Sequence, residues 1–158
     1  MFTRFITTAV LLCAATGAFA TPQIQHWQAP SGARVYFVED HGLPMLDVAV
    51  TFPAGSGFDA ADKVGVASLT SGMLDRGAQG LSEDEISRKL ADIGAQMGGQ
   101  FDTDRAGMTL RTLSSATERD AALEILARCL QQPLFPEAIL TREKARMIAA
   151  LKLSLIHI

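Results

Sequence analysis

Residues 82–113 read SEDEISRKLADIGAQMGGQFDTDRAGMTLRTL, and this stretch carries a helix signal followed directly by two strand signals. Ser82 and Glu85 have the spacing of a capping box, in which the hydroxyl accepts from the backbone N–H of Glu85 while the carboxylate reaches back. Apolar residues then recur at helical spacing: Ile86, Leu90 and Ile93. Gly94 follows as a stop signal, so the pattern predicts a helix that ends there.

Two runs with strand character come next. They cover residues 95–102 and 106–113, and the polar residues 103–105 between them are a turn signal. The arrangement predicts an antiparallel β-hairpin. Gly98 and Gly99 lie inside the first strand, where glycine indicates either a bulge or a place at which another backbone approaches closely.

Upstream of this stretch, the pattern predicts three strands and a helix. Alternating residues at 25–28 and 33–39 flank a turn and indicate a first hairpin, and a third strand follows at 46–52. Residues 64–74 are predicted to form a short helix that ends near Gly77. Its helically spaced apolar residues are Val66, Leu69, Met73 and Leu74.

Downstream, two further helices are predicted. Ser115 and Glu118 repeat the capping-box spacing, and Pro133 ends the helix that they open. The apolar side of that helix consists of Ala122, Ile125, Leu126, Cys129 and Leu130. Pro136 begins the last helix, since its missing N–H is not needed in a first turn. The apolar side of this helix consists of Leu140, Met147, Ile148 and Leu151.

The order of these elements predicts the fold class. Strands that are grouped in hairpins and helices that are grouped in pairs favour an α+β, two-layer architecture, with a mainly antiparallel sheet covered by helices on one face. The chain is long enough for one core and short for two domains.

Residues 1–20 have the pattern of a secretory signal peptide. Arg4 supplies the positive charge, an apolar run follows, and Ala-Phe-Ala at residues 18–20 is a cleavage site, which makes Thr21 the expected mature N-terminus. The apolar run is shorter than the roughly 20 residues of a membrane-spanning helix. We therefore expect secretion, into the periplasm of a Gram-negative bacterium, and no membrane segment after cleavage.

The last residues, LSLIHI at 153–158, do not obviously continue the amphipathic pattern before them. The same letters are one translation of a transposon mosaic end used in preparing sequencing libraries. We expect these residues to be a sequencing artefact, which removes His157 from any site. A natural apolar C-terminus is the alternative.

Composition excludes some classes of function. The net charge of -3 becomes -4 when Arg4 is removed, and acidic and basic residues are interspersed, so neither nucleic acid nor an anionic membrane is an expected partner. Signal cleavage leaves Cys129 as the only cysteine. We interpret it as a buried, inert thiol, because it lies on an apolar helix face and has no partner for an internal disulfide.

Several short motifs, in order and spacing, resemble the N-terminal half of M16 peptidase domains, the family of insulinase, pitrilysin and mitochondrial processing peptidase. They are Gly32-Ala33-Arg34 through His41 with Pro44, then Ala54-Gly55-Ser56, Gly65-Val66-Ala67, Met73-Leu74 and Gly77. The resemblance continues through the helix at 82, the hairpin at 95 and the helix at 136. It implies a metallohydrolase fold and a partial, C-terminally truncated N-terminal domain over residues 21–152.

Active members of this family carry His-x-x-Glu-His on the helix after Gly-(Leu/Val)-Ala. Two histidines at i and i+4 share a helix face and bind Zn²⁺, and the glutamate is the general base for the zinc-bound water. Here the corresponding positions are Ser68, Ser71 and Gly72, and the third ligand falls at Ala149 or Ala150. The resemblance thus implies no catalytic residue, no metal and no cofactor in this chain, with zinc only in an active partner subunit.

Other chemistries find little support in the sequence. The serines lack a G-x-S-x-G elbow, an S-x-x-K pair and a histidine at triad spacing. His26 and His41 lack helical spacing, and surface or hydrogen-bonding roles are the simpler interpretation. Asp102, Asp104 and Arg105 form a hairpin tip that we interpret as a solvated turn, with a Ca²⁺ site as the alternative.

The resemblance implies the non-catalytic subunit of a heterodimeric periplasmic zinc peptidase, whose partner carries the intact motif. The strand at 95–102 resembles the family's peptide-binding edge, where extended peptides pair by β-augmentation. The residues expected at this edge are Ala95, Gln96, Met97, Gly98, Gly99 and Gln100. Two alternatives remain: a free-standing periplasmic peptide-binding or chaperone-like protein, and an active zinc metalloendopeptidase with ligands outside the family pattern.

Overall fold

The computed structural model describes residues 22–156 of the chain. The predicted signal peptide over residues 1–20 and His157 lie outside the described residues. The chain divides into two compact units, one that ends at Leu43 and one that begins at Pro44. No helix among the described residues combines the length and the apolarity that a membrane crossing requires.

The first unit is a β-hairpin of β1 (Ile24–Gln28) and β2 (Arg34–Val38). The strands are antiparallel, from the pair Ile24 and Val38 to the pair Gln28 and Arg34. In the turn, the N–H of Gly32 donates to the carbonyl of Ala29 at 2.8 Å. This confirms the hairpin predicted from residues 25–28 and 33–39, with bounds that agree within one residue.

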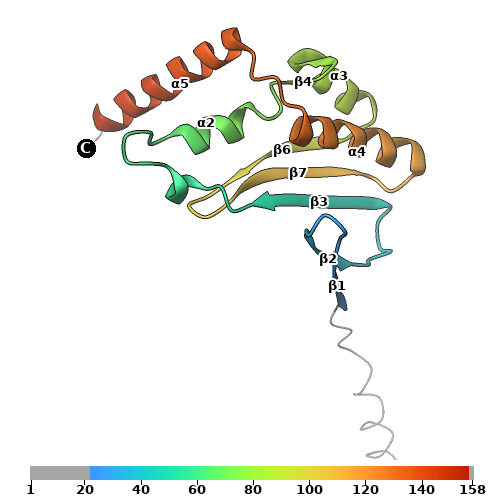
Figure 1. Ribbon diagram of the computed structural model, residues 1–158. Helices are drawn as coiled ribbons and strands as arrows, with labels where there is room; N and C mark the ends of the chain where they lie inside the picture. Colours follow the sequence, from blue (N-terminus) through green and yellow to red (C-terminus); the bar gives the residue numbers. More distant parts are fainter. Residues whose placement is uncertain (1–21, 157–158) are drawn as a thin grey trace, which may run out of the picture. The chain divides into compact units, whose positions relative to one another are not determined.

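The second unit contains a three-stranded antiparallel sheet in the order β3-β7-β6. The central strand β7 (Ala106–Leu113) pairs along its length with β3 (Met45–Phe52) on one side and with β6 (Gln96–Phe101) on the other. Figure 1 shows the three strands side by side, although β3 lies far from the other two in the sequence. The hairpin predicted at 95–113 is confirmed.

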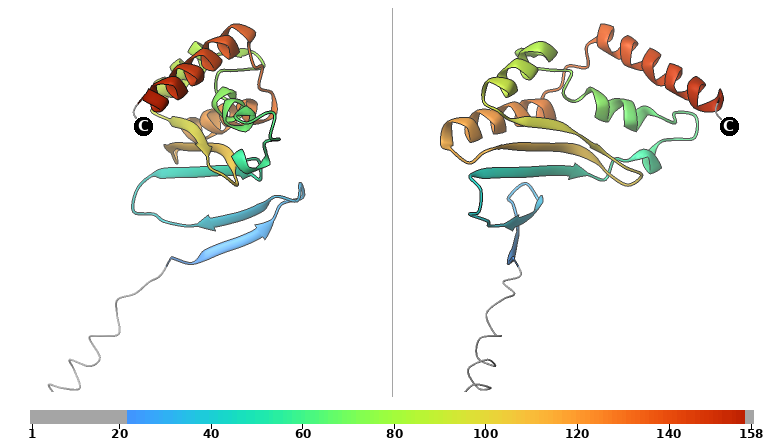
Figure 2. Two further views of the ribbon diagram at one scale, coloured as in Figure 1. Left: turned by 90° about the vertical axis from the view of Figure 1, so that its left-hand side faces the viewer. Right: turned by 180° about the vertical axis from the view of Figure 1, so that it is seen from behind.

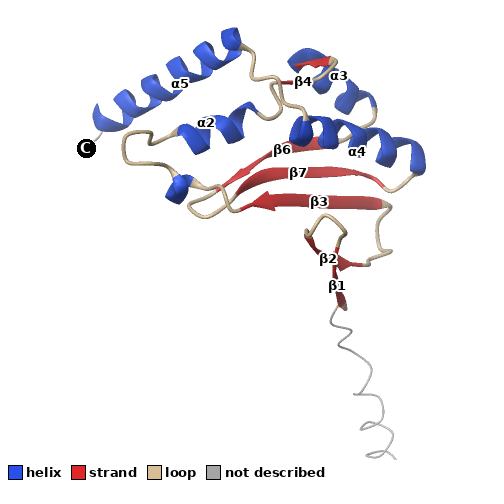
Figure 3. Ribbon diagram, in the orientation of Figure 1, coloured by secondary structure: helices blue, strands red, loops and turns tan. Residues whose placement is uncertain are grey.

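Four helices belong to this unit: α2 (Val66–Met73), α3 (Glu83–Asp92), α4 (Ala116–Gln131) and α5 (Glu137–Ile156). Helices α2 and α4 contact β7, α2 and α3 contact β6, and α5 contacts α2. Figures 1 and 2 show these helices on one side of the sheet, and Figure 3 shows the same division into helical and strand layers. The predicted two-layer α+β fold with an antiparallel sheet is therefore confirmed.

The core lies between the sheet and the helices. The alternation of side chains along β7 explains which of its residues are buried there. On β7, Met108, Leu110 and Thr112 are buried while Thr109 and Arg111 are exposed, as the period of two requires. The helices contribute apolar residues at helical spacing: Ile86, Leu90, Ala122, Ile125, Leu126 and Cys129. These are the apolar sides predicted for α3 and α4.

The capping box of α3 is present as predicted. The Ser82 hydroxyl accepts from the N–H of Glu85 at 3.3 Å, and the Glu85 carboxylate accepts from the N–H of Ser82 at 2.9 Å. The equivalent spacing at Ser115 and Glu118 does not give the same motif. The Ser115 hydroxyl donates to the Glu118 carboxylate instead, and it caps no backbone N–H.

Other local features differ from the sequence prediction. Three short elements were missed because each is too brief for periodicity to reveal: the 3-10 turn η1 (Ser56–Phe58) and the two-residue strands β4 (Gly77–Ala78) and β5 (Leu81–Ser82). Helix α2 begins two residues later than predicted, and Val66 is 52% exposed instead of packed.

Helix α5 also differs from the prediction. Its predicted apolar side is largely uncovered, since Ile148 is 54% and Leu151 is 64% exposed. The helix continues to Ile156, so its backbone includes residues 153–156. Over residues 137–153, the part of α5 whose burial is described, the acidic Glu143 is the one buried residue and is 7% exposed.

Candidate functional site

Helix α2 carries the positions that the family resemblance singles out, and a carboxylate holds its start in place. Asp59 accepts from the N–H of Gly65 at 2.8 Å and from the N–H of Ala67 at 2.9 Å. These are unpaired donors of the first turn, and a negative charge at a helix N-terminus is favourable. Gly65 has φ of 100°, which favours glycine at the residue before the helix.

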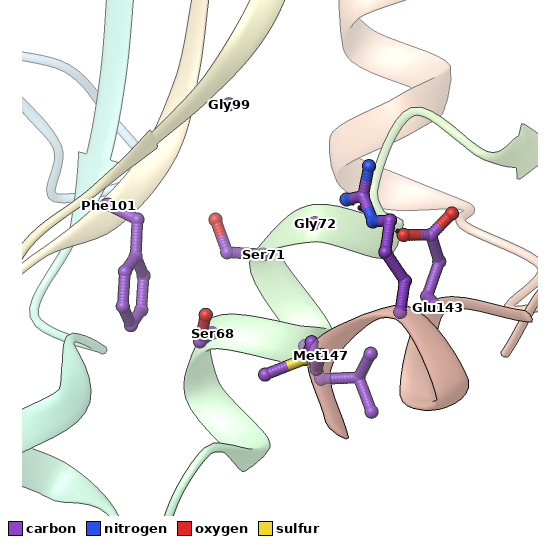
Figure 4. A pocket seen from close by; sticks show the side chains of 9 residues that line it. Ser68, Ser71, Gly72, Gly99, Phe101, Glu143 and Met147 are labelled. Atoms are coloured by element: carbon purple, nitrogen blue, oxygen red, sulfur yellow. Dashed lines mark ion pairs between the residues drawn. The ribbon is translucent and has the colours of Figure 1, made fainter. Parts of the chain in front are cut away.

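Ser68, Ser71 and Gly72 lie together on one wall of a cavity of about 270 Å³. The other walls come from β6 and α5, and the remaining lining residues are Leu69, Gly99, Phe101, Glu143, Arg146 and Met147. Figure 4 shows Ser68 and Ser71 on the side of α2 that faces Phe101 and Gly99, with Glu143 and Met147 entering from α5. Ala149 and Ala150, the predicted positions of the third ligand, are exposed and do not line this cavity.

Glu143 is the one acidic side chain in the cavity wall, and arginines already neutralise it. Arg146 lies 2.9 Å from its Oε2 atom and Arg142 lies 3.2 Å from its Oε1 atom. Its side chain is 9% exposed, so its charge needs these partners. Sequence reasoning missed Glu143, because an acidic residue on a charged helix gives no signal of burial.

Arg142 also joins α5 to the start of α3, where a second carboxylate lies. Glu83 accepts from Arg76 at 2.6 Å and from Arg142 at 3.1 Å. Burial opposes the ionisation of Glu83, but the hydrogen bonds from Arg76 and Arg142 outweigh it and hold the pKa of Glu83 below its ordinary value. The hydrogen bond from Arg76 to Glu83 likewise raises the pKa of the guanidinium. This network fixes α5 beside the cavity.

The cavity residues do not fit a zinc ion. The wall offers two hydroxyls and a glycine, whereas a zinc site of the family type needs two imidazoles and a carboxylate. The nearby Glu143 is already ion-paired with Arg146. Residues 22–156 contain no group of three or more His, Cys, Asp or Glu side chains that could hold a metal. Neither a zinc-bound water nor a general base can be built from the residues at these positions.

Strand β6 is an edge strand of the sheet as described, and its register with β7 is continuous from Gln96 to Phe101. Gly98 and Gly99 therefore form no bulge. The N–H of Asp102 donates to the carbonyl of Arg105 at 2.9 Å. Since bonding alternates along an antiparallel ladder, the backbone groups of Met97, Gly99 and Phe101 face outward from β7.

Two of the expected edge residues differ in their exposure. Ala95 is buried and lies just before β6, and its N–H donates to the carbonyl of Leu90 at 2.9 Å, so it is not part of the accessible edge. Gly99 is exposed, and a Cβ added there would lie 3.8 Å from the carbonyl oxygen of Ser71. The edge therefore passes directly beside the cavity.

The other candidate residues have structural roles. The Asp102 carboxylate accepts from the N–H groups of Asp104 and Arg105 at 2.8 and 2.7 Å, which is a hydrogen-bonded turn and leaves little of this oxygen for a cation. In the first unit, His41 contacts Glu39 at 3.0 Å, and His26 stacks on Tyr36 at a centroid distance of 6.4 Å.

Cys129 is completely buried in the core, as predicted. Burial, assisted by the nearby Asp75 charge, raises the pKa of its thiol to about 11. A thiol with such a pKa is protonated at neutral pH and is a poor nucleophile.

A family model described as insulinase, peptidase family M16, matches residues 34–152. Among solved structures, the chain is similar to the inactive domain of a peptidase M16 from Pseudomonas fluorescens, with 37% identity and a TM-score of 0.79 over 82% of this chain and 31% of that one. This chain thus spans about a third of that relative. No curated protein matches the chain.

Two more distant structures share the fold. Pitrilysin has 24% identity and a TM-score of 0.66, over 85% of this chain and 14% of that one. A protease from Helicobacter pylori has 18% identity and a TM-score of 0.64, over 75% of this chain and 28% of that one. Since the family model covers residues 34–152, which is most of the chain, the chain belongs to the M16 (insulinase-like) peptidase family.

Proposed function

We propose that this protein is a non-catalytic M16 subunit that binds extended peptides and pairs with an active, zinc-bearing M16 subunit. One observation carries the proposal: at the positions where the family resemblance places the zinc motif, α2 has Ser68, Ser71 and Gly72, which offer neither an imidazole nor a carboxylate. The similarity to a domain described as inactive supports it.

The size of the chemical loss supports the absence of catalysis. Removing one outer partner of a zinc ligand commonly lowers affinity or activity about 10- to 100-fold. On the family resemblance, two imidazoles, the general base and the third carboxylate are all replaced here, and a site that lacks all four is proposed to be inactive. In the proposed pair, zinc belongs to the partner subunit, and this chain contributes peptide binding.

Peptide binding is proposed at the β6 edge. Met97, Gly99 and Phe101 direct their backbone N–H and C=O groups outward, and an extended peptide can pair with such groups as an added strand. Met97 and Gly99 are adjacent outward positions on the strand, and Gly99 brings no side chain that would obstruct the incoming backbone. The edge residues of this proposal are Gln96, Met97, Gly98, Gly99 and Gln100.

Peptides with single backbone N-methyl groups test this binding mode. An N-methyl group removes one donor, so in an extended peptide it should weaken binding when it falls on the residues that pair with β6 and have little effect on the alternate residues. Fluorescence anisotropy with the complete protein measures the binding of each methylated peptide. Equal binding of all methylated peptides would refute strand addition.

The proposed partner is an M16 subunit with His-x-x-Glu-His, exported with this chain to the periplasm of a Gram-negative bacterium. The signal-peptide pattern at residues 1–20 supports the location. Co-expression with such a subunit encoded beside this gene should give one complex on gel filtration, with zinc-dependent peptidase activity that the partner's motif requires.

The alternative is a free-standing periplasmic peptide-binding or chaperone-like protein. The exposed β6 edge favours it, because strand addition at that edge needs no second subunit. Peptide binding by the isolated protein, together with no complex formation with a co-encoded M16 subunit, would favour this alternative. Zinc-dependent cleavage by the protein alone would instead indicate an active enzyme with other ligands.

A further inference from the structure

We propose that the cavity at the former metal position is a side-chain pocket for the bound peptide and selects a large apolar side chain, aromatic or long aliphatic. This inference rests on the proposed peptide binding at β6. It assigns a specificity role to the cavity left by the small residues Ser68, Ser71 and Gly72.

The geometry of the sheet places a peptide side chain at the cavity. Gly99 pairs with Met108, which is buried under the helices, so position 99 lies on the helix-covered face of β6. Residues directly opposite each other on neighbouring strands share a face. The peptide residue opposite Gly99 therefore points to the same face, where the cavity lies beside Ser71.

The size of the cavity suits one large side chain. Its volume of about 270 Å³ lies just below the roughly 300–1,000 Å³ of pockets for small molecules. A Cβ built on Gly72 meets no atom within 4 Å, which confirms open space on the α2 side. An alanine side chain would leave most of this space unfilled.

The chemistry of the walls favours an apolar occupant. Leu69, Phe101 and Met147 supply apolar surface, and Figure 4 shows Phe101 and Met147 beside the two serines of α2. The charges in the wall already balance, since Arg146 and Glu143 form an ion pair at 2.9 Å. A lysine or aspartate side chain would lose its hydration there and find no unpaired charge in the wall.

A guest series tests the pocket. The probe is a fluorescein-labelled threonine and alanine host peptide with one guest residue, which is alanine, phenylalanine, leucine, lysine or aspartate, and binding to the complete protein is measured by anisotropy. The phenylalanine and leucine guests should bind about 10-fold more tightly than alanine, because a full side chain is buried. Lysine and aspartate should bind no more tightly than alanine.

The variant Gly72→Leu fills the cavity from α2, where the space is open and leucine is a good helix former. It should reduce the preference for phenylalanine over alanine to within about 2-fold, because the guest side chain can no longer enter the cavity. Gly72→Ala, which adds only a methyl group, should keep the preference. Ala150→Leu is the matched control and should keep the preference, since Ala150 is exposed on α5 and does not line the cavity.

The outcomes separate this inference from the proposed function. If the peptides bind with no preference among guests, or if Gly72→Leu keeps the preference, the pocket assignment is wrong while peptide binding stands. If none of the peptides binds, the proposed peptide-binding function fails as well. Thermal melts of each variant identify any loss of binding that results from unfolding.

Discussion

Replacing Gly72 by alanine should stabilise the protein, although the resemblance assigns a metal ligand of the family to this position. Gly72 is in the last turn of α2, and a Cβ built there meets no atom within 4 Å. Glycine in a helix costs about 0.5–1 kcal/mol relative to alanine, because it loses more backbone freedom on folding. The substitution should recover this free energy of unfolding and introduce no clash.

The same substitution at Gly107 should have the opposite effect and lower the free energy of unfolding. A Cβ at Gly107 would overlap the carbonyl oxygen of Val50 and lie 2.9 Å from the Cα of Thr51, on the paired strand β3. Backbone atoms cannot move aside as a flexible side chain does. Gly107→Ala should therefore destabilise the protein by at least about 2 kcal/mol.

Urea unfolding followed by far-UV circular dichroism measures both variants against the wild type. We expect the midpoint to rise for Gly72→Ala and to fall for Gly107→Ala, with unchanged slopes. A loss of stability greater than about 0.5 kcal/mol in Gly72→Ala would refute the reasoning. It would mean that the space beside Gly72 is occupied in the folded protein, for example by a bound metal or a packed segment.

An ion pair, a buried thiol and a helix cap give three other predictions. Glu83→Gln should lower the free energy of unfolding by about 1–2 kcal/mol at neutral pH, because the ion pairs with Arg76 and Arg142 are lost. The folded-state pKa of Glu83 lies below its ordinary value of 4.5, so this stabilisation is complete above pH 4.5 and disappears as the pH falls through the folded-state pKa. Urea midpoints of the wild type and Glu83→Gln that stay apart at low pH would contradict this prediction. The Cys129 thiol should react with Ellman's reagent only in denaturant, since it is buried and its pKa is raised to about 11, and rapid native labelling would show that the core opens there. Ser82→Ala should cost about 1 kcal/mol by removing the cap of α3, as measured by thermal melts, and no shift in midpoint would mean that the cap is dispensable.

The sequence predicted those parts of the fold for which local signals agree with the packing. The capping box at Ser82, the period of α4 and the hairpin of β6 and β7 all appear as expected, because each local pattern is also the one that buries apolar area. The fold class follows from these elements. The residues to which the resemblance assigns the zinc motif lie on a helix, as expected, since α2 starts directly after Gly65.

The rest depends on contacts between distant residues, which a single sequence does not display. Glu143 is buried only because Arg142 and Arg146 neutralise it, and Asp59 is important only because its carboxylate reaches the N–H groups at the start of α2. The cavity exists because small residues of α2 face β6 and α5 together. The apolar side of α5 was predicted from the sequence but its exposure was not, since periodicity shows that a face is apolar but not what covers it.

The most direct test of the account is the zinc content of the complete protein after purification, equilibration with excess Zn²⁺ and removal of unbound metal. Because hydroxyls and a glycine replace the ligands at Ser68, Ser71 and Gly72, mass spectrometry of metals should find far less than one zinc per chain, and Glu143→Gln should not change the value. One zinc per chain in the wild type, lost in Glu143→Gln, would place a metal in this cavity and contradict the assignment of a non-catalytic subunit.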